Sequence, residues 1–432
     1  MTPDFSSNQS GEKTRHGCQS LWLQKKRQSA LCCFRLMGEP AEMSLGKQNT
    51  RSISDDSLTL GTSDIPVLEV DDDCEMGNVQ SDDADEGGEE SHYGPFWGRD
   101  SRTLYHQPRS DQDTLNSTQS LYDSDITYFM IHGRRYCKDY FMPNDEEEQT
   151  RTQILHTVYL YLLDQKLTTI ELENPTKILD VGTGSGEWAM AMGDEYPTAE
   201  IIGIDIAKIQ PSAVPLNVFF EIDDAEEEGG WTWPDNEFDL VHFRTMAGAF
   251  KSWDEMYAQA FKHLKPGGWI EVIDFDNHKK LLSYFDKGSV VHKWVAAIKE
   301  AAHISGRDRN GKHLEPERLE ALGFVEVSVQ TRYLPLGIWP EDPEANRIGK
   351  HNLVAQLSGL EAVSLRLLTE VLGWDPAEVR RVCKVVDEAF RKLALDPVEG
   401  HGLGAGVRIL VGRKPDKPDP SNDTTPVNGA AC

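Results

Sequence analysis

A short glycine-rich segment is the part of the sequence best suited to bind a ligand. Residues 178–186 read ILDVGTGSG, an apolar run that ends at Asp180 and continues through Gly182, Gly184 and Gly186. An apolar run that passes through glycines into a helix predicts a strand-to-helix turn. In such a turn glycine lets the backbone approach a ligand, and the helix start offers unpaired N–H groups. Cofactors that contain adenosine are bound by turns of this kind.

The spacing of the glycines separates two classes of cofactor. Dinucleotide sites prefer G-x-G-x-x-G, whereas this segment reads G-x-G-x-G after an aspartate, which favours S-adenosylmethionine. Asp205 ends the second apolar segment, at roughly the 20-residue distance expected for an acid that accepts hydrogen bonds from a ribose diol. Asp205 fits an adenosine ligand of either kind, and capping the next helix is its alternative role.

Further polar residues follow the later apolar segments. Asp223, Asp224 and Ala225 follow the third, where a side-chain acceptor and a backbone N–H suit adenine, although both acids also fit a solvated loop. Candidates for a general base, which only a protonated acceptor requires, stand at the ends of the fourth and fifth segments. They are His242, Arg244, Glu271, Asp274 and His278. His242 lies in an alternating apolar segment and suits a satisfied core histidine better, and Glu271 pairs as readily with Arg244 as with a substrate.

Five apolar segments that alternate with helical ones must position these residues. The pattern predicts strands at 177–182, 200–205, 217–222, 238–243 and 267–274, with helices at 187–195 and 253–264. This alternation calls for an α/β fold with a doubly wound parallel sheet. Two further strands, at 323–336 and 406–415, flank a helical stretch at about 343–395, which becomes an insertion that caps the sheet if those strands pair. Before the sheet, Asn144 is expected to cap a helix, with Glu147 completing a capping box.

Composition bounds the other properties of the chain. Lys and Arg number 44 against 72 Asp and Glu, a net charge of −28 that disfavours nonspecific binding to nucleic acid. No apolar run approaches the roughly 18 residues of a membrane span. Seven scattered cysteines fit free thiols, so no structural metal is expected. We expect residues 1–120, basic and then acidic, and residues 415–432 to be disordered, residues 121–176 to form an N-terminal cap segment, and residues 177–414 to form the main domain.

Residues 177–276 resemble the class I S-adenosylmethionine-dependent methyltransferases. A narrower resemblance, over about residues 120–414, is to the fungal LaeA-like methyltransferases, the family of secondary-metabolism regulators and related enzymes. It rests on five segments: GRRYCKDYFMPNDEEEQTR, IDDAEEEGGWTW, FDLVHFR, LKPGGWIEVIDFD and GLEAVSLRLLTEVLGW. The family more often has Ser-Pro where residues 207–208 are Ala-Lys.

The resemblance implies a seven-stranded, mostly parallel Rossmann-like sheet and a role for each residue of the site. In S-adenosylmethionine, the ribose is implied to bind Asp205, and the adenine is implied to contact Asp224 and Ala225. The methionine end is implied to lie against Asp180, Gly182, Thr183, Gly184 and Gly186. Tyr136 and Tyr140 close over the sulfonium in this scheme, where an aromatic face attracts a cation. Ordinary core packing of the two tyrosines is the alternative.

Three functions follow in order of preference. The first is transfer of a methyl group from S-adenosylmethionine to a fungal metabolite or a protein. The second is a regulator that keeps the fold and acts through a protein complex, a role that suits the acidic N-terminal region. An NAD(P)-dependent oxidoreductase is the third, and the glycine spacing argues against it. We expect the protein in the cytoplasm, the nucleus or both, although the basic stretch at 13–37 also fits an organelle presequence.

Overall fold

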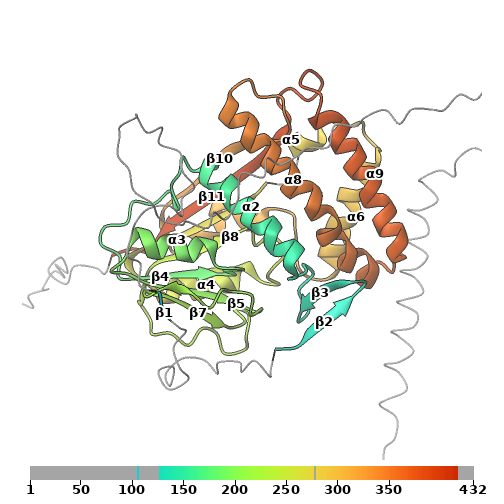
Figure 1. Ribbon diagram of the computed structural model, residues 1–432. Coiled ribbons are helices and arrows are strands. Elements are labelled where there is room, and N and C mark those ends of the chain that lie inside the picture. Colours follow the sequence, from blue (N-terminus) through green and yellow to red (C-terminus); the bar gives the residue numbers. More distant parts are fainter. Residues whose placement is uncertain (1–104, 107–125, 277–278, 417–432) are drawn as a thin grey trace, which may run out of the picture. The chain divides into compact units, whose positions relative to one another are not determined.

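The fold is built on a seven-stranded sheet of order β10-β11-β9-β8-β4-β5-β7. The computed structural model describes residues 105–106, 126–276 and 279–416 (Figure 1). The strands of the sheet are β4 (Lys177–Val181), β5 (Glu200–Asp205), β7 (Val218–Ile222), β8 (Phe238–Arg244), β9 (Leu264–Phe275), β10 (Val325–Pro335) and β11 (Gly404–Arg413). The first five are parallel, and β11 runs antiparallel to both of its neighbours. The predicted α/β class and all seven predicted strands are confirmed.

Alternation along the strands gives the sheet two apolar faces, because successive side chains point to opposite sides. Ile178 packs against Trp188 of α3 (Glu187–Glu195). Its neighbour Leu179 belongs to the core on the other face, with residues of α4 (Trp253–His263) and α7 (Pro316–Ala321). Burial on both faces explains why these strands read as nearly continuous apolar runs.

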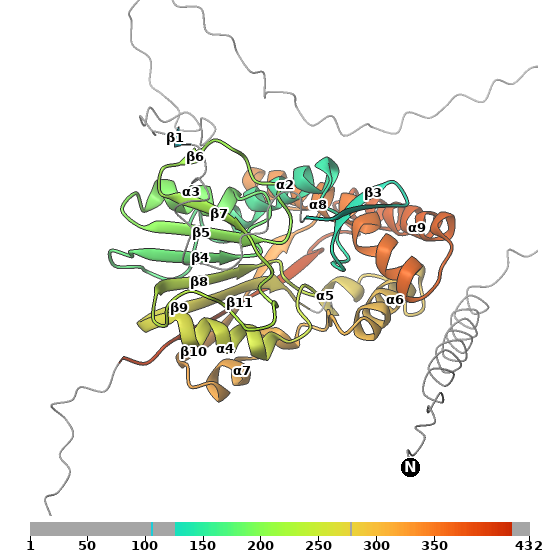
Figure 2. The same cartoon turned by 90° about the horizontal axis from the view of Figure 1, so that it is seen from below.

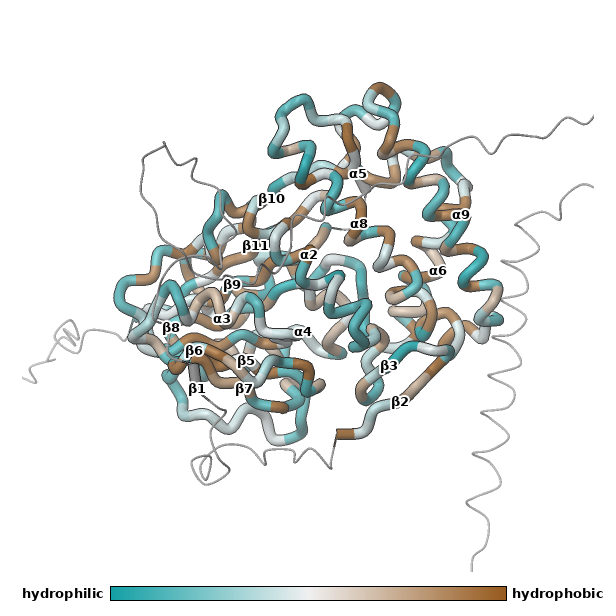
Figure 3. The backbone as a smooth tube through the Cα atoms, viewed as in Figure 1, coloured by the Kyte–Doolittle hydropathy of each residue, from teal (hydrophilic) through white to brown (hydrophobic). Residues whose placement is uncertain are grey.

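A helical cap forms its own hydrophobic core beside the sheet (Figure 2). Its helices are α5 (Lys279–Leu282), α6 (Val290–Ile304), α8 (Pro343–Arg366), a π-helical turn η3 (Leu367–Val371) and α9 (Pro376–Ala394). The last three form the predicted insertion between β10 and β11. The other two come from the β9–β10 connection and were not predicted. Figure 3 shows α9 alternating between hydrophobic and hydrophilic residues, as expected for a helix with one buried face.

The helix before the sheet, α2 (Glu146–Leu162), begins one residue later than predicted. Asp145 is its N-cap and accepts a hydrogen bond from the backbone N–H of Glu148, so the prediction of Asn144 as the cap was wrong. The side-chain oxygen of Asn144 instead accepts a hydrogen bond from Arg135 at 2.8 Å. Either residue type can cap a helix, and the hairpin that supplies Arg135 decides between them.

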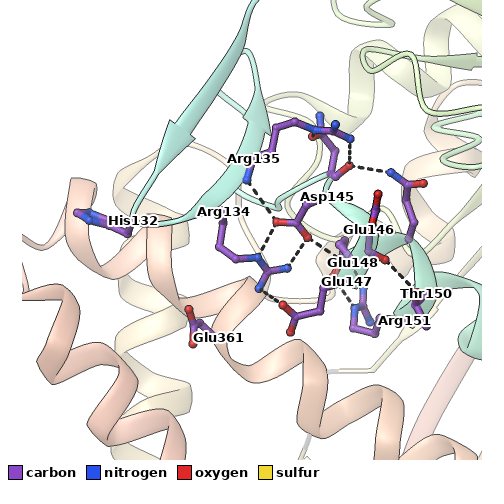
Figure 4. Close-up of polar contacts among 12 residues, drawn as sticks. His132, Arg134, Arg135, Asp145, Glu146, Glu147, Glu148, Thr150, Arg151 and Glu361 are labelled. Carbon is purple, nitrogen blue, oxygen red and sulfur yellow. Dashed lines mark hydrogen bonds and ion pairs between the residues drawn. The ribbon is translucent and has the colours of Figure 1, made fainter.

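That hairpin consists of β2 (Tyr128–Ile131) and β3 (Arg134–Cys137). Arg134 donates two hydrogen bonds to the carboxylate of Asp145, at 2.6 and 2.8 Å, and so fixes the hairpin to the start of α2 (Figure 4). Burial opposes ionisation of Asp145, but the hydrogen bonds from Arg134 and from the backbone outweigh it and lower its pKa.

Three short elements complete the described part of the chain, namely β1 (Tyr105–His106), which pairs with β6 (Val214–Pro215), and the 3₁₀ turn η2 (Lys312–Leu314). None of the helices in residues 126–276 and 279–416 is long and apolar enough to cross a membrane. Nearly all of the predicted N-terminal region, the tail from residue 417 and His278 lie outside the described residues.

Candidate functional site

A cavity of about 350 Å³ opens at the carboxyl ends of the parallel strands, the edge where open α/β sheets bind ligands. The sheet lines one half of it, with residues 180–185, 204–207 and 223–226 that follow β4, β5 and β7. The other half is lined by α2 and the cap. Apolar residues of the cap at this wall are Leu281, Trp294, Ile298, Leu357, Leu360 and Phe390. We call these two parts the sheet half and the cap half.

The three glycines of the predicted turn serve different purposes. A Cβ atom on Gly182 would meet the side chain of Met246, and one on Gly186 would meet the ring of Phe220. Both of these glycines therefore make room for the protein itself, and Gly186 does not line the cavity. A Cβ on Gly184 would meet nothing within 4 Å, and Gly184 lines the cavity at a φ of +60°. Only Gly184 presents bare backbone to open space.

A buried cluster fixes the start of the turn. Asp180 accepts a hydrogen bond from the hydroxyl of Thr183 at 2.7 Å, and its other carboxylate oxygen lies 2.8 Å from Nδ1 of His242. The ring of His242 stacks on Trp188, with 3.7 Å between ring centroids. Asp180 and Thr183 line the cavity, whereas His242 has no exposed surface and does not. His242 is thus a core residue that positions Asp180, and its candidacy as a base in contact with a substrate was wrong.

Glu271 is excluded from contact with a substrate in the same way. Its side chain is fully buried, and one carboxylate oxygen accepts hydrogen bonds from the backbone N–H and the hydroxyl of Thr169, at 2.8 and 2.6 Å. The second oxygen lies 3.9 Å from Nε2 of His242. Burial makes Glu271 part of the support of the sheet, and the alternative, a pair between Glu271 and Arg244, does not form either.

Asp205 lies at the cavity, at the tip of β5. Its two carboxylate oxygens accept hydrogen bonds from the backbone N–H groups of Gly184 and Ala207, both at 2.9 Å. Each oxygen keeps a second lone pair. Burial raises the pKa of Asp205 to about 6, so the carboxylate is mostly ionised at neutral pH and is protonated under mildly acidic conditions.

The loop after β7 also reaches the cavity. Asp224 and Ala225 both line it. The carboxylate of Asp224 lies 2.9 Å from Nζ of Lys138, and the carbonyl oxygen of Ala225 accepts a hydrogen bond from the indole of Trp231. The side chain of Asp224 therefore has a cationic partner within the protein. The backbone N–H of Ala225 donates no hydrogen bond to any side chain among the described residues.

The two tyrosines expected over the cofactor occupy different places. Tyr136 is completely buried beneath the guanidinium of Arg366, at 5.2 Å, and does not line the cavity, so its expected place over the cofactor was wrong. Tyr140 does line the cavity. Arg366 donates hydrogen bonds to the carbonyl oxygens of Lys138 and Tyr140, at 2.9 and 2.7 Å, and thereby holds residues 138–140 across the site.

Four arginines line the cavity, and they differ in their partners. Arg151 pairs with Glu148, and Arg307 pairs with Glu226 and Asp139. Arg244 and Arg309 have no carboxylate within ion-pair distance among residues 126–276 and 279–416. Arg244 instead lies over the ring of Tyr159, and Arg309 over that of Phe141, each at 5.1 Å.

Sequence reasoning missed His156 of α2, which also lines the cavity. Its Nδ1 lies 3.2 Å from a guanidinium nitrogen of Arg244, and because a guanidinium only donates, Nδ1 is the acceptor. Burial lowers the pKa of His156 to about 3, with the charge of Arg244 acting in the same direction. The imidazole is therefore neutral at physiological pH and is a weak base. Spacing gave no signal for His156, since it stands on the polar flank of α2.

Comparisons with known proteins agree with this geometry. A model described as a methyltransferase domain matches residues 152–323. A protein named methyltransferase pytC, from Aspergillus terreus, is 37% identical over 279 residues, which cover 62% of this chain and 84% of that protein. The secondary metabolism regulator LAE1 of Cochliobolus heterostrophus is 32% identical over 285 residues, covering 64% of this chain and 91% of that protein.

Solved structures add only a loose likeness. A phosphoethanolamine N-methyltransferase of Haemonchus contortus aligns with a TM-score of 0.37 at 16% identity, covering 63% of this chain and 59% of that chain. The strand order described above, rather than this alignment, carries the assignment of the fold.

Proposed function

The chain belongs to the fungal LaeA-like family of methyltransferases, and from that premise we propose that it binds S-adenosylmethionine in the cavity and transfers the methyl group to a metabolite or a protein in secondary metabolism. The observation that carries the proposal is the wall of the sheet half. There the backbone of Gly184, which carries no side chain, lies beside the carboxylate of Asp205, and each carboxylate oxygen can accept a further hydrogen bond. This combination fits an adenosine ribose laid against a glycine turn.

The residues of the sheet half fit the parts of the cofactor in order along the strand ends. Asp180 and Gly184 lie at the first strand, Asp205 at the second, and Asp224 with Ala225 at the third. In this proposal the carboxylate of Asp205 accepts the ribose hydroxyls, and the loop at Ala225 meets the adenine through its backbone. Asp224 contributes less than the family pattern implied, because Lys138 already engages its carboxylate.

Arg244 suits the carboxylate of the methionine moiety. Phe243 pairs with Val181 in the sheet, so Arg244, the next residue, lies beside the start of the glycine turn. Arg244 is half-buried at the cavity without an anionic partner among the described residues, and desolvation lowers its pKa. A carboxylate ligand would supply the missing countercharge through a charge-assisted hydrogen bond.

When bound, S-adenosylmethionine supplies an electrophilic methyl group on a positively charged sulfur. The contribution of the chain is alignment and exclusion of water. Residues 138–140, held by Arg366, and the apolar wall of the cap shield the site. With a pKa of about 3, His156 is a poor general base at neutral pH.

Calorimetric titration of the full chain with S-adenosylhomocysteine tests the proposal. Wild type should bind, and Gly184→Arg should lose at least a hundredfold in affinity because the side chain fills the open space beside residue 184. Gly373→Arg is the matched control, since Gly373 also has a positive φ, of +72°, with nothing within 4 Å of its Cβ position, but lies away from the cavity. No binding by the folded wild type, or equal loss in the two variants, contradicts the proposal.

A second function stays open because several relatives bear the name secondary metabolism regulator. In that case the fold serves a protein complex, and methyl transfer is secondary. Expression of Gly184→Arg in place of the wild-type chain separates the two functions. Loss of the biological output favours the enzyme, and survival of the output favours the regulator. Location in the cytoplasm, the nucleus or both stays a prediction.

A further inference from the structure

The cap half of the cavity contains an arginine, Arg309, that forms no ion pair with any residue the structure describes. Arg309 stands in the loop after α6 and lines this half. Its only hydrogen bond in the described part of the chain goes to the carbonyl oxygen of Ala247, at 2.5 Å. Phe141 covers one face of the guanidinium. Arg309 is not among the residues proposed to contact the cofactor.

No acid among the described residues forms an ion pair with Arg309. The charge of Asp274 acts on Arg309 and opposes the lowering of its pKa, but the carboxylate lies 3.3 Å from Nε2 of His313. The other arginines that α2 and this loop bring to the cavity are paired, Arg151 with Glu148 and Arg307 with Glu226 and Asp139. A guanidinium withdrawn from water without a countercharge is costly, and burial lowers the pKa of Arg309. An unpaired guanidinium of this kind is typical of a binding site in which the ligand supplies the countercharge.

The other residues of the cap half indicate the chemistry of the rest of the ligand, beyond its anionic group. Apolar side chains from four helices line the same half of the cavity: Leu281, Trp294, Ile298, Leu357, Leu360 and Phe390. A wall of this composition binds a hydrophobic body, while one polar group fixes its orientation. Because one arginine faces the ligand with Asp274 near it, a single negative charge is matched better than the double charge of a phosphate.

We propose that the methyl acceptor is a hydrophobic carboxylic acid whose carboxylate is bound by Arg309 and whose apolar body lies against the cap. In the transfer, a nucleophilic, unprotonated atom of this acid forms a bond to the methyl carbon as the bond from the sulfonium sulfur to that carbon breaks, and S-adenosylhomocysteine leaves as a neutral thioether. This inference rests on the proposed function, since it assigns the second substrate of the same cavity. It makes Arg309 a specificity-determining residue and leaves the cofactor to the sheet half. An acceptor without a negative charge would leave the guanidinium buried and unpaired, which disfavours its binding.

The experiment screens a panel of small hydrophobic carboxylic acids against the full chain loaded with S-adenosylhomocysteine. Each acid, such as 4-phenylbutyrate, is paired with its primary alcohol and its amide, and affinity is measured by calorimetry. We expect acids to bind about ten- to a hundredfold more tightly than their neutral partners, the scale of a charge-assisted hydrogen bond. Arg309→Gln should abolish that preference, and Arg309→Lys, which keeps the charge, should retain part of it.

Two controls make the result decisive. Arg347→Ala removes an exposed arginine of α8 that is not at the cavity, and it should leave the preference unchanged. The affinity of each variant for S-adenosylhomocysteine reports whether the sheet half is intact. If wild type fails to bind S-adenosylhomocysteine, the proposed function fails. If it binds and no acid binds, if neutral partners bind equally well, or if Arg309→Gln keeps the preference, only the present inference is overturned.

Discussion

The two halves of the cavity are built in different ways. The sheet half comes from three short segments, 180–185, 204–207 and 223–226, each directly after a parallel strand. The cap half draws on α2, on the loop after α6 and on α8 and α9, which are far apart in the sequence. A site made at strand ends follows from the sheet, whereas a site made between packed helices depends on how those helices pack. The first half suits a fixed cofactor and the second a variable acceptor.

The halves also differ in charge. Acids dominate the sheet half, with Asp180, Asp205, Asp223 and Asp224 at the cavity. In the cap half the unbalanced charge is positive, at Arg309, and the remaining wall is mostly apolar. A cationic donor and an anionic acceptor would therefore each meet the opposite charge. The predictions below perturb one half at a time.

The largest effect is expected from Leu365→Ala in the cap. Leu365 has no exposed surface and packs in the core of the cap without lining the cavity. Truncation of a buried leucine costs about 2 to 5 kcal/mol of the free energy of unfolding. Chemical denaturation should show this loss, and affinity of the folded variant for S-adenosylhomocysteine should stay at the wild-type value. A large fall in that affinity would show that the halves are not separable.

Asp145→Ala acts on the hairpin that borders both halves. It removes the N-cap of α2 and leaves Arg134, which is largely buried, without its closest carboxylate. We expect the free energy of unfolding at pH 7 to fall by about 2 to 3 kcal/mol. The lowered pKa of Asp145 means that this contribution is present at neutral pH and is lost as pH falls from the ordinary pKa of aspartate through the lower pKa of Asp145. Equal stabilities of variant and wild type at pH 7 would contradict this role.

Asp205→Ala tests the sheet half alone. Loss of the ribose acceptor should weaken binding of S-adenosylhomocysteine by about 1.5 to 3 kcal/mol, the range for hydrogen bonds to charged groups. The preference for acids over alcohols should survive in this variant at saturating cofactor, because Arg309 is untouched. Titration calorimetry measures both quantities, and an unchanged dissociation constant for the cofactor product would remove Asp205 from the site.

The smallest effect is a pH dependence that belongs to the same carboxyl group. The pKa of Asp205 is about 6, so the carboxylate is lost as pH falls below that value. Affinity for S-adenosylhomocysteine should therefore decline on acidification from pH 7 to pH 5, by at most about 1.4 kcal/mol per pH unit. Asp205→Asn should bind more weakly and with a flat profile over this range. A flat profile in wild type would assign the ribose to another group.

Much of the fold and of the sheet half could be predicted because the physical signals are local. Apolar runs of five to seven residues between helical segments specify parallel strands, and a glycine turn after the first strand needs no distant partner to be recognised. Asp180, Gly184 and Asp205 all lie at the cavity, as expected from their positions at strand ends. Helix α6, in the β9–β10 connection, was not predicted, although its buried residues Val291, Val295, Ile298 and Ala302 recur at helical spacing.

Tertiary structure alone decided which residues of the right type face the cavity. His242 and Arg244 stand two residues apart at the end of one strand, yet the first is buried in the core and the second lines the cavity. The same holds for Tyr136 and Tyr140, of which only Tyr140 reaches the site.

The sequence by itself determined the strands of the sheet, which of those strands end at the ligand-binding edge, and the family. These properties depend on periodicity and on motifs within short segments. The tertiary structure decided the cap half, where Arg309 remains without an ion pair because Asp274 lies beside His313 and Glu148 is bound to Arg151. Whether a charge is balanced depends on distances between side chains from separate helices and loops, and no one-dimensional pattern encodes those distances.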